Sequence, residues 1–141
     1  MVKILEATLC DGSYAIDFQF TRNDTEIIRR ALDKFGFDYI EIVHRLGLGA
    51  SVLGKGKAFC SDEEYFSTAA NAIKNAKWDS FFIPEIGDYS QIDLAVDQGM
   101  KYISIGTNIN EIENSLPYMR YAKKKGLEVF NHDPIVELQG Y

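Results

Sequence analysis

Hydrophobic and polar positions repeat one arrangement three times along the chain. A glycine followed by a short apolar run occurs at residues 36–42, 99–105 and 126–130. The glycine can take the left-handed conformation that ends a helix, and the run after it is rich in strand-forming β-branched and aromatic residues. A repeated series of helix, glycine and strand predicts an array of βα units with parallel strands.

Helix starts are marked between these predicted strands. Thr21 with Asp24, and Ser61 with Glu64, have the spacing of a capping box, and an apolar stripe with helical period follows each pair. The stripe expected after the first pair consists of Ile27, Ile28, Ala31, Leu32 and Phe35.

Two further helices are predicted in the second half of the chain. Asp88 is expected to cap a helix that ends at Gly99, and Asn114 is expected to cap one that ends at Gly126. Pro117 then falls in the first turn, where a proline is tolerated. Strands are expected near residues 2–9, 37–43, 79–84, 101–106 and 127–131.

The resulting order of elements predicts an α/β fold with parallel strands. A closed (β/α)8 TIM barrel takes about 250 residues, whereas this chain has 141. We therefore expect a partial TIM barrel of about four βα units plus a fifth strand. A doubly wound sheet is the competing architecture, and it would need a reversal of strand order that a sequence cannot reveal.

Composition mainly excludes classes of protein. Apolar residues make up 46% of the chain, as in globular domains, and no apolar run is long enough to cross a bilayer. No signal peptide is visible, and two cysteines make no disulfide framework, so we expect a cytoplasmic protein. The net charge of −6 argues against nucleic acid as a partner.

Candidate chemistry lies where the first predicted strand ends. The run ends in the residues Thr8, Leu9, Cys10, Asp11 and Gly12. An acidic side chain at the C-terminal end of a parallel strand occupies the place where βα barrels carry their active sites. The sequence therefore predicts that Asp11 lies at the mouth of the sheet.

This stretch resembles the Thr-Leu-Arg-Asp-Gly signature of the metal-dependent aldolases and lyases related to 4-hydroxy-2-oxovalerate aldolase and 3-hydroxy-3-methylglutaryl-CoA lyase. Residues 44–51, 83–87 and 105–111 are similar to the segments that follow the family's next three strands. The resemblance implies that residues 1–130 form the N-terminal half of an aldolase-like barrel, with residues 131–141 a tail of unclear role. It also implies carbon–carbon bond cleavage or formation on a small 2-oxo or hydroxy acid.

The same resemblance implies a divalent cation, Mn²⁺ or Mg²⁺, bound by Asp11 and by a His-x-His pair on a late strand. This chain lacks that pair, since His44 and His132 are its only histidines. Cys10 stands where the family has Arg, and Tyr14 stands where the aldolase has its base histidine. A cysteine supplies no fixed cation, and a tyrosine with an ordinary pKa of about 10 is a poor base.

These departures favour a second hypothesis, a catalytically degenerate barrel that binds a metabolite or a protein partner. Under the enzyme hypothesis, three groups of residues are candidates by their position. The catalytic candidates are Cys10, Tyr14 and His44; the candidates for substrate binding are Glu41, Glu85 and Asn108; and the metal candidate is Asp11.

Each candidate also has a purely structural interpretation. Cys10 could be a small buried thiol, Asp11 could cap a turn, and either glutamate could pair with a neighbouring cation. The glycines of residues 47–56 could cradle a phosphate, although they form no known nucleotide-binding pattern.

Two expectations concern binding. One carboxylate is not a metal site, so we expect weak or absent metal binding by this chain alone. An incomplete barrel has open sheet edges, so we expect a homo-oligomer.

Overall fold

All the described strands run parallel and follow one another in sequence order. The computed structural model describes residues 2–42, 46–107 and 109–132. One sheet has the order β1-β2-β3 and the other the order β4-β5-β6, and all neighbours are parallel. The strands are β1 (Leu5–Glu6), β2 (Tyr39–Glu41), β3 (Lys77–Asp79), β4 (Phe81–Phe82), β5 (Tyr102–Gly106) and β6 (Glu128–His132). The predicted parallel βα array is confirmed, and the described strands show no reversal of the doubly wound kind.

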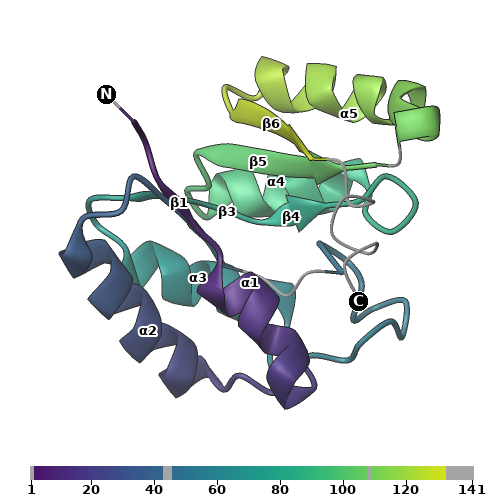
Figure 1. The fold of residues 1–141 in the computed structure, drawn as a ribbon. Helices are drawn as coiled ribbons and strands as arrows, with labels where there is room; N and C mark the ends of the chain where they lie inside the picture. The colour runs from purple at the N-terminus through teal and green to yellow at the C-terminus, as the bar shows by residue number, and fades with distance from the viewer. Residues whose placement is uncertain (1, 43–45, 108, 133–141) are drawn as a thin grey trace.

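The long helices connect consecutive strands and pack beside one another (Figure 1). The pairs in contact are α2 with α3, α3 with α4, and α4 with α5, whereas the short α1 lies apart at the end of β1. The helices are α1 (Thr8–Gly12), η1 (Ser13–Ile16), α2 (Arg22–Phe35), α3 (Asp62–Ala72), α4 (Tyr89–Asp97), η2 (Ile109–Glu111) and α5 (Ile112–Lys124). None of these described helices has both the length and the apolar character of a bilayer-spanning segment.

Strand side chains alternate between two environments. Ile40, Trp78 and Ile103 join the main hydrophobic core, which also contains buried residues of α3, α4 and α5. On the opposite face the rings of Tyr39 and Tyr102 meet edge-on, with centroids 4.9 Å apart. This second face corresponds to the inside of a barrel, and aromatic side chains fill part of it.

The predicted helix signals are largely confirmed. Capping boxes start α2 at Thr21 and α3 at Ser61, and Asp88 caps α4. The glycines before the repeated strands have φ angles of 89° at Gly36, 105° at Gly99 and 87° at Gly126. The repeated pattern was therefore a correct guide to where helices end.

The predicted strand 2–9 is wrong in its second half, because Thr8–Gly12 forms the helix α1. The Glu6 carboxylate accepts hydrogen bonds from the backbone N–H and the hydroxyl of Thr8, and this turns the chain directly after β1. The Asp11 N–H then donates to the Ala7 carbonyl at 2.9 Å. Asp11 therefore lies on a helical turn after the strand and not at the strand terminus.

Two other boundaries also differ. The predicted strand 79–84 is divided, since β3 ends at Asp79, Ser80 intervenes and β4 begins at Phe81. The last helix begins at Ile112 rather than after Asn114, and Pro117 lies inside it. The 3-10 turn η2 leads directly into α5, so the helix begins before Asn114. The position of Pro117 was therefore a wrong guide to the first turn of this helix.

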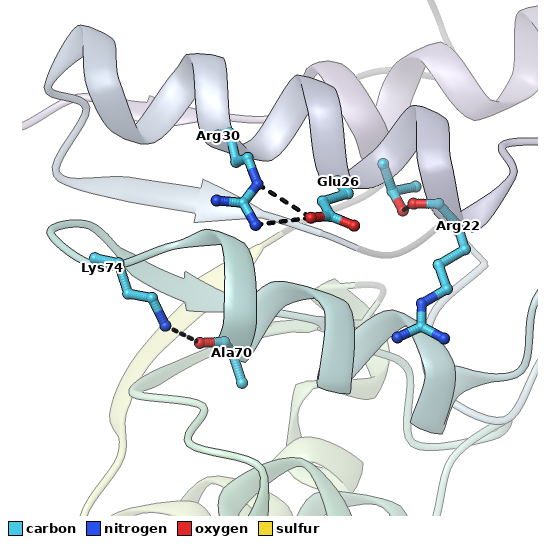
Figure 2. Close-up of polar contacts among 6 residues, drawn as sticks. Arg22, Glu26, Arg30, Ala70 and Lys74 are labelled. Atoms are coloured by element: carbon cyan, nitrogen blue, oxygen red, sulfur yellow. Dashed lines mark hydrogen bonds and ion pairs between the residues drawn. The ribbon is translucent and has the colours of Figure 1, made fainter.

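The buried positions of α2 are polar, and the predicted apolar stripe is buried only in part, with Leu32 packed against the core. Thr25, Arg29 and Asp33, spaced four residues apart, are buried. Ile27 is 60% exposed and Phe35 is 83% exposed. Figure 2 shows the solvent side of this region, where Arg30 donates to Glu26 and Lys74 donates to the Ala70 carbonyl.

Candidate functional site

Two carboxylates lie side by side where β2 and β3 end. Glu41 and Asp79 are register partners in neighbouring parallel strands, so their side chains point to the same face of the sheet. Glu41 is 5% exposed and Asp79 is fully buried. Ser104 and Tyr102 of β5, both fully buried, place their hydroxyls beside Asp79. Buried polar groups from three strands thus meet on the inner face.

Electrostatics favour a protonated Asp79. Burial raises the pKa of Asp79 well above its ordinary value, and the neighbouring Glu41 raises it further. The Ser104 and Tyr102 hydroxyls face the carboxylate and lower its pKa, but among the described residues neither meets it with hydrogen-bond geometry. These hydroxyls therefore offset only part of the cost of burying the charge.

Cys10 covers this cluster from α1. Its side chain is 2% exposed, and burial, followed by the adjacent Glu41 carboxylate, raises the pKa of its thiol. A nucleophilic cysteine needs the opposite environment, one that stabilises the thiolate. The surroundings of Cys10 favour a small buried thiol over a nucleophile.

The other predicted residues near α1 face solvent. Asp11 is exposed, and Tyr14 is 52% exposed, with its ring edge-on against Phe18 at a centroid distance of 5.2 Å. Because α1 follows the C-terminal end of β1, both residues lie at the end of the sheet where Glu41 and Asp79 end their strands. Asp11, Tyr14 and Cys10 are therefore brought to one end, together with Glu41.

Glu85 also follows the C-terminal end of its strand, β4, so it lies at the same end as Asp11. It is exposed, and its charge acts on the Tyr118 hydroxyl of α5. His44 and Asn108 lie outside the described residues.

The glycine-rich segment after β2, residues 47–56, makes close contacts with residues of α3 and α4. The Gly49 N–H donates to the Asp62 carboxylate at 2.9 Å. A Cβ at Gly49 would lie 2.5 Å from the Gln91 amide nitrogen, so this glycine allows a close approach. The first turn of α3 carries three acidic residues, which oppose an anion at that helix end. These contacts favour a packing role over a phosphate cradle.

The described residues do not form a complete metal site. Within residues 2–42, 46–107 and 109–132, no three His, Cys, Asp or Glu side chains are grouped so that they could hold a metal ion. Asp11, Glu41 and Asp79 supply carboxylates at one end of the sheet, but not in such a group.

Sequence reasoning missed Asp79 and Tyr102. A usable signal existed, because Asp79 is an acid in a predicted strand region, between Trp78 and the pair Phe81 and Phe82. Aligning the strand ends would have paired it with Glu41. The sequence therefore indicates the acid at position 79, but its pairing with Glu41 can be predicted only when the strand register is known.

Comparison with known proteins finds similarity over most of the chain. An oxaloacetate decarboxylase of Mycobacterium tuberculosis is 37% identical over 126 residues, which cover 89% of this chain and 37% of the relative. A 4-hydroxy-2-oxovalerate aldolase of Pelotomaculum thermopropionicum is 37% identical over 128 residues, covering 91% of this chain and 38% of the relative. The aldolase of the same name from Bacillus thuringiensis is 34% identical over 128 residues.

The chain spans less than two-fifths of the length of these curated relatives, 37% to 38%. No family model matches the chain.

Proposed function

We propose that this chain is part of an aldolase- or lyase-type (β/α)8 barrel. The premise is its resemblance to the N-terminal part of the 4-hydroxy-2-oxovalerate aldolases. In the complete protein this barrel would cleave or form a carbon–carbon bond in a small 2-oxo or hydroxy acid. The similar proteins are named for oxaloacetate and for 4-hydroxy-2-oxovalerate, which are both 2-oxo acids.

The observation that carries the proposal is the position of the signature-like stretch. Cys10 and Asp11 follow the C-terminal end of β1, and Glu41 ends the neighbouring strand β2. In βα barrels this end of the strands carries the chemistry. At this end the exposed Asp11 and Tyr14 would face a substrate, whereas Glu41, Asp79, Tyr102 and Ser104 are buried.

A divalent cation, Mn²⁺ or Mg²⁺, is part of the proposal only for the complete protein. Asp11 would be one ligand, and the others would come from outside the described residues. We expect calorimetry of this chain with Mn²⁺ to show no tight site, because such a site needs three or more protein ligands. Stoichiometric micromolar binding that Asp11→Ala abolishes would contradict this expectation.

The proposed reaction is tested by release of pyruvate. Decarboxylation of oxaloacetate yields pyruvate and CO₂, and aldol cleavage of 4-hydroxy-2-oxovalerate yields pyruvate and acetaldehyde. The complete protein, with Mn²⁺, is expected to release pyruvate from one of the two above the rate in buffer, and Asp11→Ala is expected to abolish the excess. Asp97→Asn, at an exposed acid at the end of α4 with no assigned role in the site, is the matched control and should retain it. No excess with either substrate would refute the proposal.

A degenerate barrel that binds a metabolite or protein is the second candidate, favoured by the buried neutral thiol at Cys10. Cys10→Arg separates the two, because it places a cation beside Glu41. Pyruvate release by Cys10→Arg together with an inactive natural sequence would support the degenerate barrel.

We also propose that this polypeptide self-associates. β1 and β6 each pair on one side only among the described strands. Val2, 89% exposed, and Ile4, 54% exposed, lie beside β1, and unpaired edges with apolar flanks favour pairing. Light scattering is expected to show a dimer or larger species at tens of micromolar. A mass of one chain that does not change with concentration would exclude it.

A further inference from the structure

Two consecutive residues after η1 adopt a backbone conformation that is unfavourable for their side chains. Asp17 has a φ of 51° and Phe18 a φ of 60°, and neither is a glycine. A bulky residue in the left-handed region is an outlier, and it persists only where the surroundings impose it. The chain therefore holds Phe18 in place by its contacts.

Those contacts begin with the ring. Phe18 is 8% exposed and belongs to the main hydrophobic core, while Tyr14, Ala15 and Ile16 of η1 face solvent. A Cβ at Gly56 would lie 2.7 Å from the Phe18 ring, so the glycine-rich segment passes directly against it. Tyr14 packs on the same ring from η1. Phe18 thus fills the space between the segment after β1 and the segment after β2.

Backbone hydrogen bonds join the same two segments. The Phe18 N–H donates to the Ser13 carbonyl at 2.8 Å, and the Phe18 carbonyl accepts from the Phe59 N–H at 3.2 Å. The Gln19 side chain donates to the Lys57 carbonyl at 3.1 Å. Ser13 in turn donates its hydroxyl to the Cys10 carbonyl at 2.6 Å. A continuous set of bonds therefore runs from residues 57–59 through Phe18 to the site residues of α1.

Few residues of the unit formed by α1 and η1 are buried. Within residues 8–18, only Leu9, Cys10, Ser13 and Phe18 are buried. The N-cap residue of α1, Ala7, offers no side-chain cap, although the Glu6 carboxylate accepts from the Thr8 N–H. Segments with few buried contacts open locally before the whole domain unfolds. The buried hydrophobic side chains of the unit thus lie at its two ends, with Leu9 and Cys10 at one end and Phe18 at the other.

We propose that Phe18 is a positioning residue whose contacts, here called the latch, hold the α1–η1 unit over the end of the sheet. The unit carries Cys10, Asp11 and Tyr14. Loss of the latch contacts opens the unit without unfolding the domain. The role concerns where these residues are held, and it does not depend on the proposed reaction. The left-handed pair makes the closed state strained, so loss of the ring contacts should shift the unit toward the open state.

Accessibility of Cys10 tests the latch directly. In a Cys60→Ala background Cys10 is the only thiol, so alkylation reports on Cys10 alone. Global unfolding is followed separately by the fluorescence of Trp78, which is 4% exposed. The rate of Cys10 alkylation is then compared with the rate of global unfolding. We expect Cys10 to react faster than global unfolding allows, with a weak dependence on denaturant. Phe18→Ala should raise the alkylation rate in native buffer at least about tenfold.

Three variants separate the latch from general destabilisation. Phe18→Leu keeps an apolar side chain and should restore most of the protection, whereas Asp17→Gly, which tolerates positive φ, should slow alkylation slightly. Phe66→Ala, on α3 with its ring stacked on Trp78, should change Cys10 alkylation only through global unfolding. If Cys10 alkylation follows Trp78 unfolding with the same denaturant dependence in the natural sequence and in Phe18→Ala, no separate latch exists and the proposal is overturned.

Discussion

Replacement of Asp33 by alanine is expected to lower the free energy of unfolding by about 3 kcal/mol. The buried Asp33 carboxylate accepts backbone N–H groups of Lys74 at 3.0 Å, Asn75 at 2.9 Å and Ala76 at 2.7 Å, and the Asn75 side-chain amide at 3.0 Å. These residues follow α3, so one carboxylate of α2 fixes the turn that leads into β3. A bond to a charged acceptor contributes about 1.5–3 kcal/mol, and bonds to one group do not add fully.

Denaturant unfolding followed by Trp78 fluorescence measures this loss. Asp33→Asn keeps the shape and part of the acceptor capacity, so it should fall between alanine and the natural residue. Asp97→Ala is the matched control, since Asp97 is an exposed acid at the end of α4, and it should change stability by less than about 0.5 kcal/mol. Equal effects at Asp33 and Asp97 would show that the four bonds contribute nothing net.

The effect of Asp33 should depend on pH. Burial by itself raises the pKa of Asp33, but the N–H groups of Ala76, Lys74 and Asn75 outweigh it and hold the pKa below its ordinary value of 3.8. Because the folded state has the lower pKa, the contribution is complete above about pH 4 and is lost as the pH falls through the folded pKa. The stability difference between the natural protein and Asp33→Ala should therefore shrink in acid.

Local signals explain why much of the fold could be predicted from the sequence. A capping box such as Ser61 with Glu64 involves residues three positions apart, and the left-handed glycine after a helix acts on its own turn. Parallel strands then follow from the repeated alternation of helix and strand. None of these inferences needs the position of any distant residue.

Most of the failures involve distant partners. The helix stripe of α2 was assumed to be buried because it is apolar, yet Asp33 finds its partners about forty positions away, at residues 74–76. The helix α1 forms because Glu6 turns the chain, which a strand pattern does not indicate. The pairing of Glu41 with Asp79 needs strand register, and the conformation of Phe18 depends on a glycine 38 positions later, Gly56.

Arg29 is the position at which we expect the largest loss of stability. Its side chain is fully buried, donates to the Tyr65 carbonyl at 2.8 Å and to the Ile42 carbonyl at 2.9 Å, and lies over the Tyr65 ring at 5.6 Å. It thus ties α2 both to the end of β2 and to α3. Arg29→Ala should lower the free energy of unfolding by about 4 kcal/mol, because it leaves a cavity and removes the donor from two carbonyls.

Two substitutions separate these causes at Arg29. Arg29→Met keeps most of the volume without any donor, so it should lose about 2 kcal/mol, and Arg29→Lys can satisfy one carbonyl and should lose less. Arg30→Ala is the control on the same helix, because Arg30 pairs with Glu26 at the surface (Figure 2) with its side chain 58% exposed, and such pairs contribute about 0.5 kcal/mol or less. Burial lowers the pKa of Arg29, which shows that the charged form is costly to bury. If Arg29→Met matched the natural protein, that cost would equal the gain from the two hydrogen bonds, and the role of Arg29 would be packing alone.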